Sequence, residues 1–105
     1  QYPKGPKEIL RFSLKMELVL SEKVKQKLKE FVARDAKLAN KIYKQLDIFM
    51  VNPRHPGLRL HKLAGSLDDS WSISVGPNLR LIYTLTPPGK AYFYKLGTHD
   101  EVYRK

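Results

Sequence analysis

The spacing of the apolar residues changes once along this chain, at Asn52-Pro53, and this change limits the possible folds. Before it, apolar residues recur every three or four positions, which is the period of an amphipathic helix. After it, Trp71, Ile73 and Val75 alternate with serines, which is the period of a half-buried strand. A proline disfavours helical backbone angles in the residue before it, so the helical part ends at Asn52. The pattern predicts an α+β domain with the helices first and most of the strands second.

The helical part divides into two helices. Ser21 is a suitable N-cap for the first helix, with Glu22 in its first turn, and Asp35 can cap the second. The join near Asp35 is very short, so the helices either form a tight antiparallel hairpin or bend there. The stripes expected to face the core are Val24, Leu28, Phe31 and Val32 in the first helix, and Leu38, Ile42, Leu46, Phe49 and Met50 in the second.

The other apolar segments predict strands. Residues 8–20 can hold one or two, residues 58–63 form a short candidate, and further strands follow at 70–75, 79–86 and 91–96. Short turns join the later strands, so they pair antiparallel. The expected fold is a two-helix antiparallel hairpin packed on one face of a mostly antiparallel sheet of about four or five strands. The other face of the sheet is left open.

Composition narrows the class of function. A chain of 105 residues fits one domain, expected over 16–105, with 1–15 as an extension that includes a possible extra strand. The formal net charge of +10 favours polyanionic partners such as nucleic acid. The absence of cysteine excludes disulfides, thiol catalysis and cysteine zinc sites. No membrane span or hydrophobic signal core is found, so we expect a cytoplasmic protein without a membrane partner.

Two histidines and one arginine are the main candidates for chemistry. His61 lies in LRLHKL and His99 in GTHD, whereas His55, in a proline turn, is expected at the surface. Arg80 interrupts an apolar strand, so it must face open surface or hold a partner. The spacing of His55 and His61 matches no common ligand pattern, and we expect no metal site.

The last strand and the tail carry aromatic and acidic side chains. Tyr92 and Tyr94 are candidates for base stacking, but at least one of them is expected in the core. Tyr103 lies outside the strand pattern and is the better candidate for stacking. The acidic pair at 100–101 is expected to cap or to pair with the basic pair at 104–105.

Four segments, in this order and spacing, resemble the RelE/ParE superfamily of toxins from bacterial toxin–antitoxin systems. MELVLSEKVKQKLKEF resembles the opening strand and first helix, HPGLRLHKLAG the segment after the hairpin, and WSISVGPNLRLIY the central hairpin. GTHDEVYR is similar to the C-terminal segment of the YafQ-like branch. The resemblance covers about Met16 to Arg104. It implies a RelE-like fold and a ribosome-dependent, metal-independent mRNA endoribonuclease that inhibits translation, needs no cofactor and is neutralised by a cognate antitoxin.

The resemblance also assigns roles to single residues. It implies that His99 is the general acid, with general base as the alternative, and that His61 is a second acid/base group or a phosphate ligand. Arg80 would stabilise the scissile phosphate of mRNA bound on the 70S ribosome. The positions expected to bind RNA are Lys62, Arg59 and Tyr103.

Ser74 and Asn78 stand where the YafQ-like branch has a histidine and an aspartate, which leaves the general base open. One alternative is a ParE-like inhibitor of DNA gyrase, which does not need His61 and His99 at one site. The other is a non-enzymatic basic module that binds RNA or protein. The antitoxin is expected to be helical and acidic, and to wrap over the helices or the open sheet face.

Overall fold

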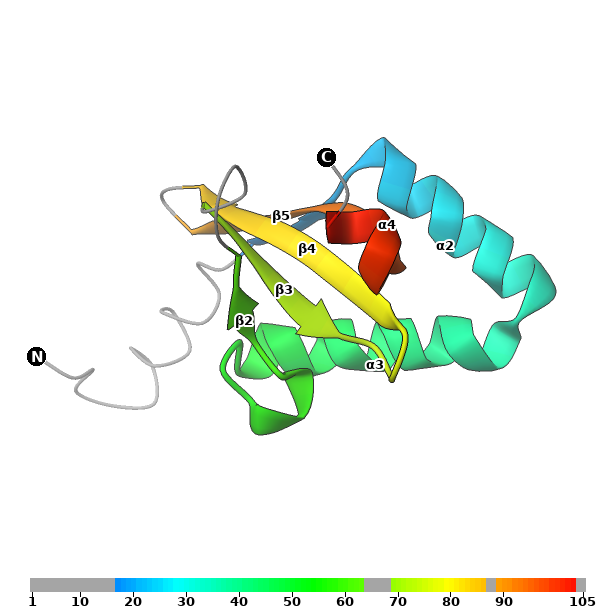
Figure 1. Cartoon of the computed structure of the whole chain (residues 1–105), viewed down its shortest axis with the longest axis horizontal. Helices are drawn as coiled ribbons and strands as arrows, with labels where there is room; N and C mark the ends of the chain where they lie inside the picture. Colours follow the sequence, from blue (N-terminus) through cyan, green and yellow to red (C-terminus); the bar gives the residue numbers. More distant parts are fainter. Residues whose placement is uncertain (1–16, 64–68, 87–88, 104–105) are drawn as a thin grey trace, which may run out of the picture.

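Five strands and three α-helices make up the described part of the chain (Figure 1). The computed structural model describes residues 17–63, 69–86 and 89–103, so the expected extension at 1–15 lies outside the described residues. The strands are β1 (Glu17–Leu20), β2 (His61–Lys62), β3 (Ser70–Ser74), β4 (Leu79–Thr86) and β5 (Lys90–Thr98); the helices are α2 (Glu22–Arg34), α3 (Ala36–Val51), the 3-10 turn η1 (Pro56–Leu58) and α4 (His99–Tyr103).

The strands form one sheet in the order β1-β5-β4-β3-β2. Neighbouring strands from β2 to β5 pair antiparallel, and β1 pairs with β5 in parallel. The mostly antiparallel sheet is therefore confirmed. The expected strand at 58–63 is mostly wrong, because η1 occupies its beginning and only His61–Lys62 pairs with β3.

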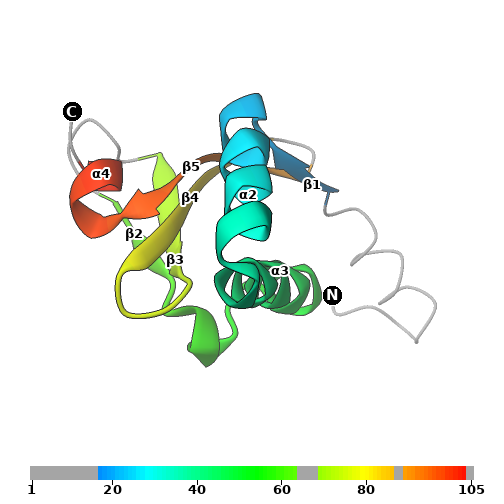
Figure 2. The same ribbon diagram turned by 90° about the vertical axis from the view of Figure 1, so that its right-hand side faces the viewer.

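Both predicted helix caps are present. The Ser21 hydroxyl accepts a hydrogen bond from the Val24 N–H, and the Asp35 carboxylate accepts one from the Leu38 N–H. Asp35 ends α2 and begins α3, so no loop separates the two helices. Figure 2 shows α2 and α3 on one side of the sheet and α4 on the other. No helix in the described ranges is long and apolar enough to cross a bilayer.

The main core lies between the α2–α3 hairpin and the sheet. At its centre Phe49 contacts Tyr83 and Phe93 edge to face, with ring centroids 4.9 and 5.1 Å apart. Such aromatic pairs add about 0.5–1.5 kcal/mol beyond the burial of their area. From the predicted stripes, Val24 and Ile42 are buried, but Val32 is 51% exposed and does not join the core.

The second sheet face is not open as expected. Ser70, Ser72 and Ser74 are buried although their strand was predicted to be half-buried. A small second core covers part of this face, with Val102 of α4 packed on Ile82 and Leu63, and Tyr94 beside them. The Tyr94 and Ser70 hydroxyl groups are hydrogen-bonded to each other. Tyr94 is therefore the core tyrosine of the predicted pair, and Tyr92 is 38% exposed and stacks on it.

Alkaline destabilisation tests the burial of Tyr83. Burial raises the pKa of Tyr83 to about 12 from the ordinary 10.0, although the nearby positive charge of Arg54 opposes this. Folding therefore gains stability from keeping the phenol neutral. This contribution is fully present below pH 10 and is lost as the pH rises toward 12. We expect the free energy of unfolding of the wild type to fall relative to Tyr83→Phe by about 1.4 kcal/mol per pH unit in this interval. Urea unfolding of both proteins measures it, and parallel curves would contradict the prediction.

Candidate active site

Strand register places two rows of side chains on the sheet face that carries α4. Directly paired residues share a face of a sheet. One row crosses four strands and runs through His61, Ser72, Ile82 and Lys95. The next row, two residues along each strand, joins Ser74, Arg80 and Gly97. The two rows are about 7 Å apart.

The Arg80 side chain is held by the turn between β3 and β4. Its Nη1 donates to the carbonyl oxygens of Gly76 and Leu79, both at 3.2 Å, and to Ser74 Oγ at 3.4 Å. Of the two alternatives left open for this strand arginine, open surface or a partner, the half-buried side chain has partners, and they are mainly backbone carbonyls. Gly76 has φ of 135°, which side chains rarely adopt, so the turn that supplies one of these carbonyls needs glycine.

His99 begins α4 because a capping box forms around it. The Thr98 Oγ1 accepts from the Glu101 N–H at 3.2 Å, and the Glu101 carboxylate accepts from the Thr98 N–H at 2.8 Å. This reciprocal pair fixes the first turn of α4. The His99 side chain is 68% exposed, with Nδ1 at 3.8 Å from Asp100 Oδ1.

Gly97 and Lys27 both lie next to Glu101, the capping residue of this turn. A Cβ on Gly97 would lie 2.6 Å from Glu101 Oε1, so the glycine makes room for the capping carboxylate. The hydrogen bond from the Thr98 backbone and the charge of Lys27 lower the pKa of Glu101. Lys27 Nζ lies 3.7 Å from Glu101 and donates to the Leu96 carbonyl at 2.8 Å. Glu101 therefore caps the helix, which was one of the two expected roles. The basic pair at 104–105, its expected partner in the other role, lies outside the described residues.

The predicted site residues lie in different surroundings. His61 is exposed on the edge strand β2, two strand spacings or about 10 Å from β4. Arg80 lies on β4, between the strand of His61 and β5, which leads into His99. The sheet therefore brings the three residues to one region, where several hydrogen bonds hold Arg80.

The three predicted RNA-binding residues are more scattered. Lys62 Nζ lies over the Trp71 ring at 5.5 Å, on the opposite face from its neighbour His61. Arg59 follows η1 and lines a cleft beside α3. Tyr103 ends α4, and its side chain lies outside the described part of the chain. Their RNA-binding role stays a prediction.

Sequence reasoning missed two groups of cations. Lys95 shares the row of His61 and donates to the Val102 carbonyl at 3.2 Å. Lys41 and Lys44 of α3 line the same cleft as Arg59 and Arg80. For the two lysines of α3, the only signal in the sequence was their position off the apolar stripe of the helix, which is also typical of solvated lysines.

Comparison of the sequence with models of known families and with curated proteins gives no match. Solved structures do match. A YoeB/ParE toxin from Agrobacterium tumefaciens superposes with a TM-score of 0.70 at 18% identity, over 80% of this chain and 99% of that one. This chain therefore has the fold of the RelE/ParE superfamily, as the resemblance in its sequence implied.

Within that superfamily the fold is similar to that of YafQ. YafQ from Escherichia coli gives a TM-score of 0.69 at 23% identity, over 84% of this chain and 98% of that one. The toxin–antitoxin complex DinJ-YafQ from the same organism gives 0.69 at 24% identity, over 85% and 98%. The YafQ-like fold inferred from GTHDEVYR is confirmed at the level of structure.

The packing of Gly97 against Glu101 gives a testable prediction. Gly97→Ala places a methyl group on the capping carboxylate, so we expect the capping box to open. A lost cap costs about 1 kcal/mol, and hydrogen exchange of the Thr98 amide should become about fivefold faster. Glu101→Gln keeps an oxygen acceptor and should give a smaller change. Unchanged exchange in Gly97→Ala would contradict this account of the turn.

Proposed function

We propose that this chain is the toxin of a type II toxin–antitoxin system. In this proposal it acts in the cytoplasm as a ribosome-dependent, metal-independent mRNA endoribonuclease and inhibits translation. The observation that carries the proposal is that β2, β4 and β5 of one sheet place His61, Arg80 and, directly after β5, His99, in a fold shared with YafQ and YoeB toxins. Two imidazoles can supply the acid and the base that cleavage of a phosphodiester needs, and a guanidinium can supply the positive charge.

The proposed reaction uses the substrate's own 2′-OH as nucleophile. A base removes its proton as the oxygen attacks the adjacent phosphorus, and the bond from phosphorus to the 5′-oxygen breaks. The leaving oxygen takes a proton from an acid, which gives a cyclic 2′,3′-phosphate and a 5′-OH. His99 is assigned as the acid and His61 as the base, while Arg80 stabilises the charge that develops on the phosphoryl oxygens.

The hydrogen bonds around Ser74 support this choice of base. Ser74 stands where the YafQ-like branch has a histidine, but its hydroxyl donates to the Gly76 carbonyl at 2.9 Å and accepts from Arg80. A hydroxyl held in this way positions Arg80 rather than removing a proton. Among the described residues, His61 is the remaining imidazole on this sheet face.

Primer-extension mapping of mRNA on translating ribosomes tests the proposal. We expect the wild type to cut within the ribosomal A site, and His99→Ala to lose at least about 100-fold in cleavage, the usual contribution of a general acid. His55→Ala is the matched control, because His55 is an exposed histidine whose Nδ1 only accepts from the Gly57 N–H. We expect it to cut normally.

Other outcomes would select the alternatives. Growth arrest by the wild type without any cut would overturn the nuclease and favour inhibition of gyrase. RNA binding without cuts or arrest would favour a non-enzymatic basic module. An equal loss of cleavage in His55→Ala and His99→Ala would show that His99 has no specific role in the proposed site.

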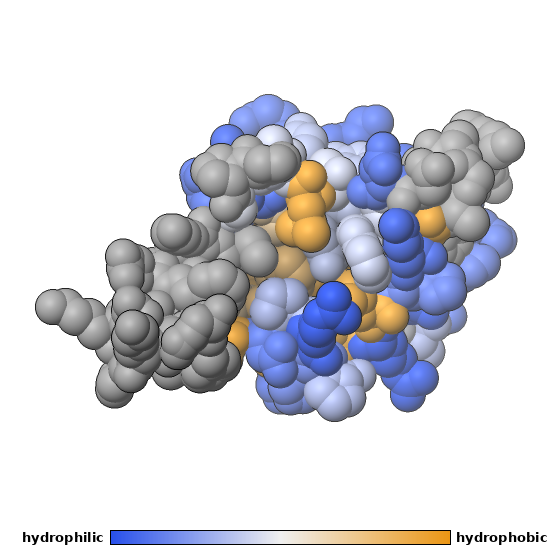
Figure 3. All heavy atoms as spheres, turned by 90° about the vertical axis from the view of Figure 1, so that its left-hand side faces the viewer, coloured by the Kyte–Doolittle hydropathy of each residue, from blue (hydrophilic) through white to orange (hydrophobic). Residues whose placement is uncertain are grey.

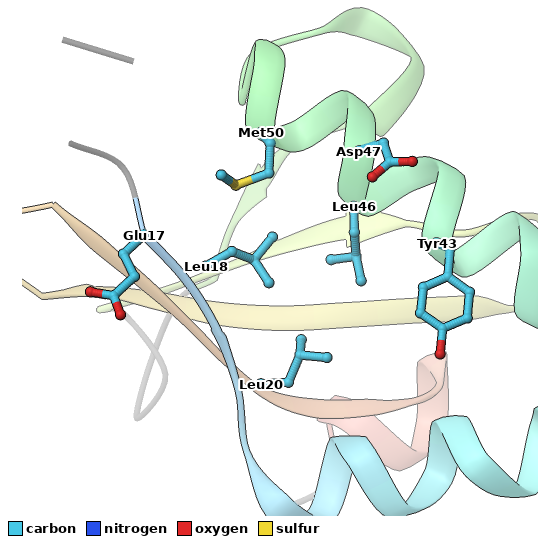
Figure 4. A pocket seen from close by; sticks show the side chains of 7 residues that line it. All are labelled: Glu17, Leu18, Leu20, Tyr43, Leu46, Asp47 and Met50. Atoms are coloured by element: carbon cyan, nitrogen blue, oxygen red, sulfur yellow. The ribbon is translucent and has the colours of Figure 1, made fainter. Parts of the chain in front are cut away.

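The proposed antitoxin has a suitable surface between β1 and α3. Figure 4 shows Leu18 and Leu20 of β1 pointing toward Leu46 and Met50 of α3, with Tyr43 at one end. This groove has a volume of about 510 Å³. A second groove shares Leu20 and Tyr43 with it and continues along α2, past Leu28, Val32 and the basic pair Lys25 and Lys29.

An amphipathic antitoxin segment with acidic side chains fits these grooves. Its apolar face would cover the leucines and Tyr43, and its carboxylates would meet Lys25 and Lys29. Within the described sheet β1 pairs only with β5, so its other edge is available to an added strand. DinJ-YafQ and the YoeB-YefM pair from Staphylococcus aureus are both toxin–antitoxin complexes, which supports a partner of this kind.

Exposed apolar residues are not confined to the grooves. Figure 3 shows scattered apolar side chains, in orange, among polar ones on one side of the molecule. Val51 is 84% exposed and lines neither of these two grooves, whereas its neighbour Met50 is 38% exposed and lines the first. The two adjacent residues therefore form a matched pair for testing the groove.

Met50→Glu should weaken binding of the cognate antitoxin about tenfold or more. It places a charge in the apolar groove and repels acidic side chains of the partner. Val51→Glu changes the net charge by the same amount and should leave the affinity within about twofold, as for a neutral surface change. Isothermal titration calorimetry with purified antitoxin measures both affinities. Equal losses would show that the groove is not the docking surface.

A further inference from the structure

A second cleft lies on the other flank of α3. It has a volume of about 660 Å³ and is bounded by α3, by the segment after η1 and by the turn between β3 and β4. Lys41 and Lys44 come from α3, Arg59 from the segment after η1, and Arg80 from β4. Segments far apart in the sequence thus place four cations around one cleft.

Hydrogen bonds across its base hold the walls of the cleft together. Gln45 Nε2 donates to the Ser74 carbonyl at 2.6 Å and to the Gly57 carbonyl at 3.2 Å. One side chain of α3 therefore joins both opposing walls. Lys41 Nζ approaches the turn as well, since it lies 3.6 Å from where a Cβ on Gly76 would stand. The cleft is part of the packed fold rather than a gap between mobile loops.

The charge in the cleft is unbalanced. No acidic residue lines it, and none of its four cations forms an ion pair with another described residue. The hydrogen bonds of Arg80 within the described chain use only Nη1, so Nε and Nη2 keep their N–H groups for a ligand. A fixed guanidinium with such donors matches the geometry of a phosphate.

The backbone at Arg59 is a second unusual feature. Arg59 has φ of 50° and is the only described non-glycine residue with a positive φ. This left-handed conformation favours glycine or asparagine, and for other residues it costs on the order of 1 kcal/mol. An arginine is nevertheless present here, and its side chain lines the cleft.

We infer that this cleft binds phosphodiester groups of RNA, next to the scissile phosphate. The inference rests on the proposed function and deepens it, because Arg80 belongs to both the cleft and the proposed active site. Lys41, Lys44 and Arg59 would hold the backbone of the strand as it leaves Arg80. Contacts of this kind are independent of base sequence and position the substrate for cleavage.

RNA explains the site better than an acidic peptide does. The apolar grooves that an amphipathic peptide needs lie elsewhere on the molecule, whereas four of the eleven residues that line this cleft are cations. Only a nucleic acid also connects the cleft to the residues proposed to cleave a phosphodiester.

Binding of a short single-stranded 2′-O-methyl RNA, measured by fluorescence anisotropy over a range of salt concentrations, tests the inference. This RNA has no 2′-OH nucleophile, so binding is measured whether or not the protein is a nuclease. We expect Lys41→Ala with Lys44→Ala to weaken binding roughly tenfold for all sequences, and to lower the salt slope by about 1.4, for two lost phosphate contacts. Both lysines are exposed, so the variant should remain folded.

Lys23→Ala with Arg34→Ala is the control, since it removes the same charge from exposed positions on α2 that line neither the cleft nor the two apolar grooves. We expect this control to lose less than about twofold in affinity. Equal losses in both double variants, or no binding by the wild type, would overturn the inference. If polyglutamate displaces the RNA, and its own binding is also lost in the variant of Lys41 and Lys44, the cleft would instead be assigned to an acidic peptide. If RNA binding depends on the cleft but the protein does not cleave mRNA on ribosomes, the inference about the cleft holds and only the proposed nuclease activity is overturned.

Discussion

The central strand β4 is covered on both faces, and the rest of the structure depends on this constraint. Leu81 and Tyr83 pack under the helix hairpin, while Ile82 packs under α4 on the other face. Arg80 is then the one charged residue of this strand, and it is half-buried between buried neighbours. A half-buried guanidinium must be hydrogen-bonded, and the β3–β4 turn supplies the acceptors. The position of the proposed phosphate-binding group thus follows from core packing.

The elements that could be predicted from the sequence are those set by local interactions. Ser21 and Asp35 cap helices through their own next turn, and the alternation around Ile73 needs only one strand. The burial of the serines could not be predicted, because it depends on segments far along the chain, such as β5, whose Tyr94 is hydrogen-bonded to Ser70. The parallel pairing of β1 with β5 is likewise a contact between distant segments.

The candidate site also has features that could be predicted from local sequence and features that depend on contacts between distant segments. An arginine within an apolar strand could be singled out as a candidate functional residue. The motif around His99 could be recognised from the sequence GTHD alone. The capping box of Thr98 and Glu101 was also visible in the spacing, but the same residues are typical of an ordinary charged tail. The cleft cations could not be found in this way, because Lys41 meets Arg80 only after α3 packs beside the β3–β4 turn.

The geometry of α3 separates the two proposed binding surfaces. Tyr43, Leu46, Asp47 and Met50 line the apolar groove, while Lys41, Lys44, Gln45 and Ile48 line the basic cleft. Each set has helical spacing, and the two are offset by two residues, or about 200° around the helix. A partner confined to the groove would therefore not cover the cleft. If the proposed antitoxin acts by displacing RNA from the cleft, its segment must extend beyond the groove, with acidic side chains that compete with RNA phosphates for Lys41, Lys44 and Arg59.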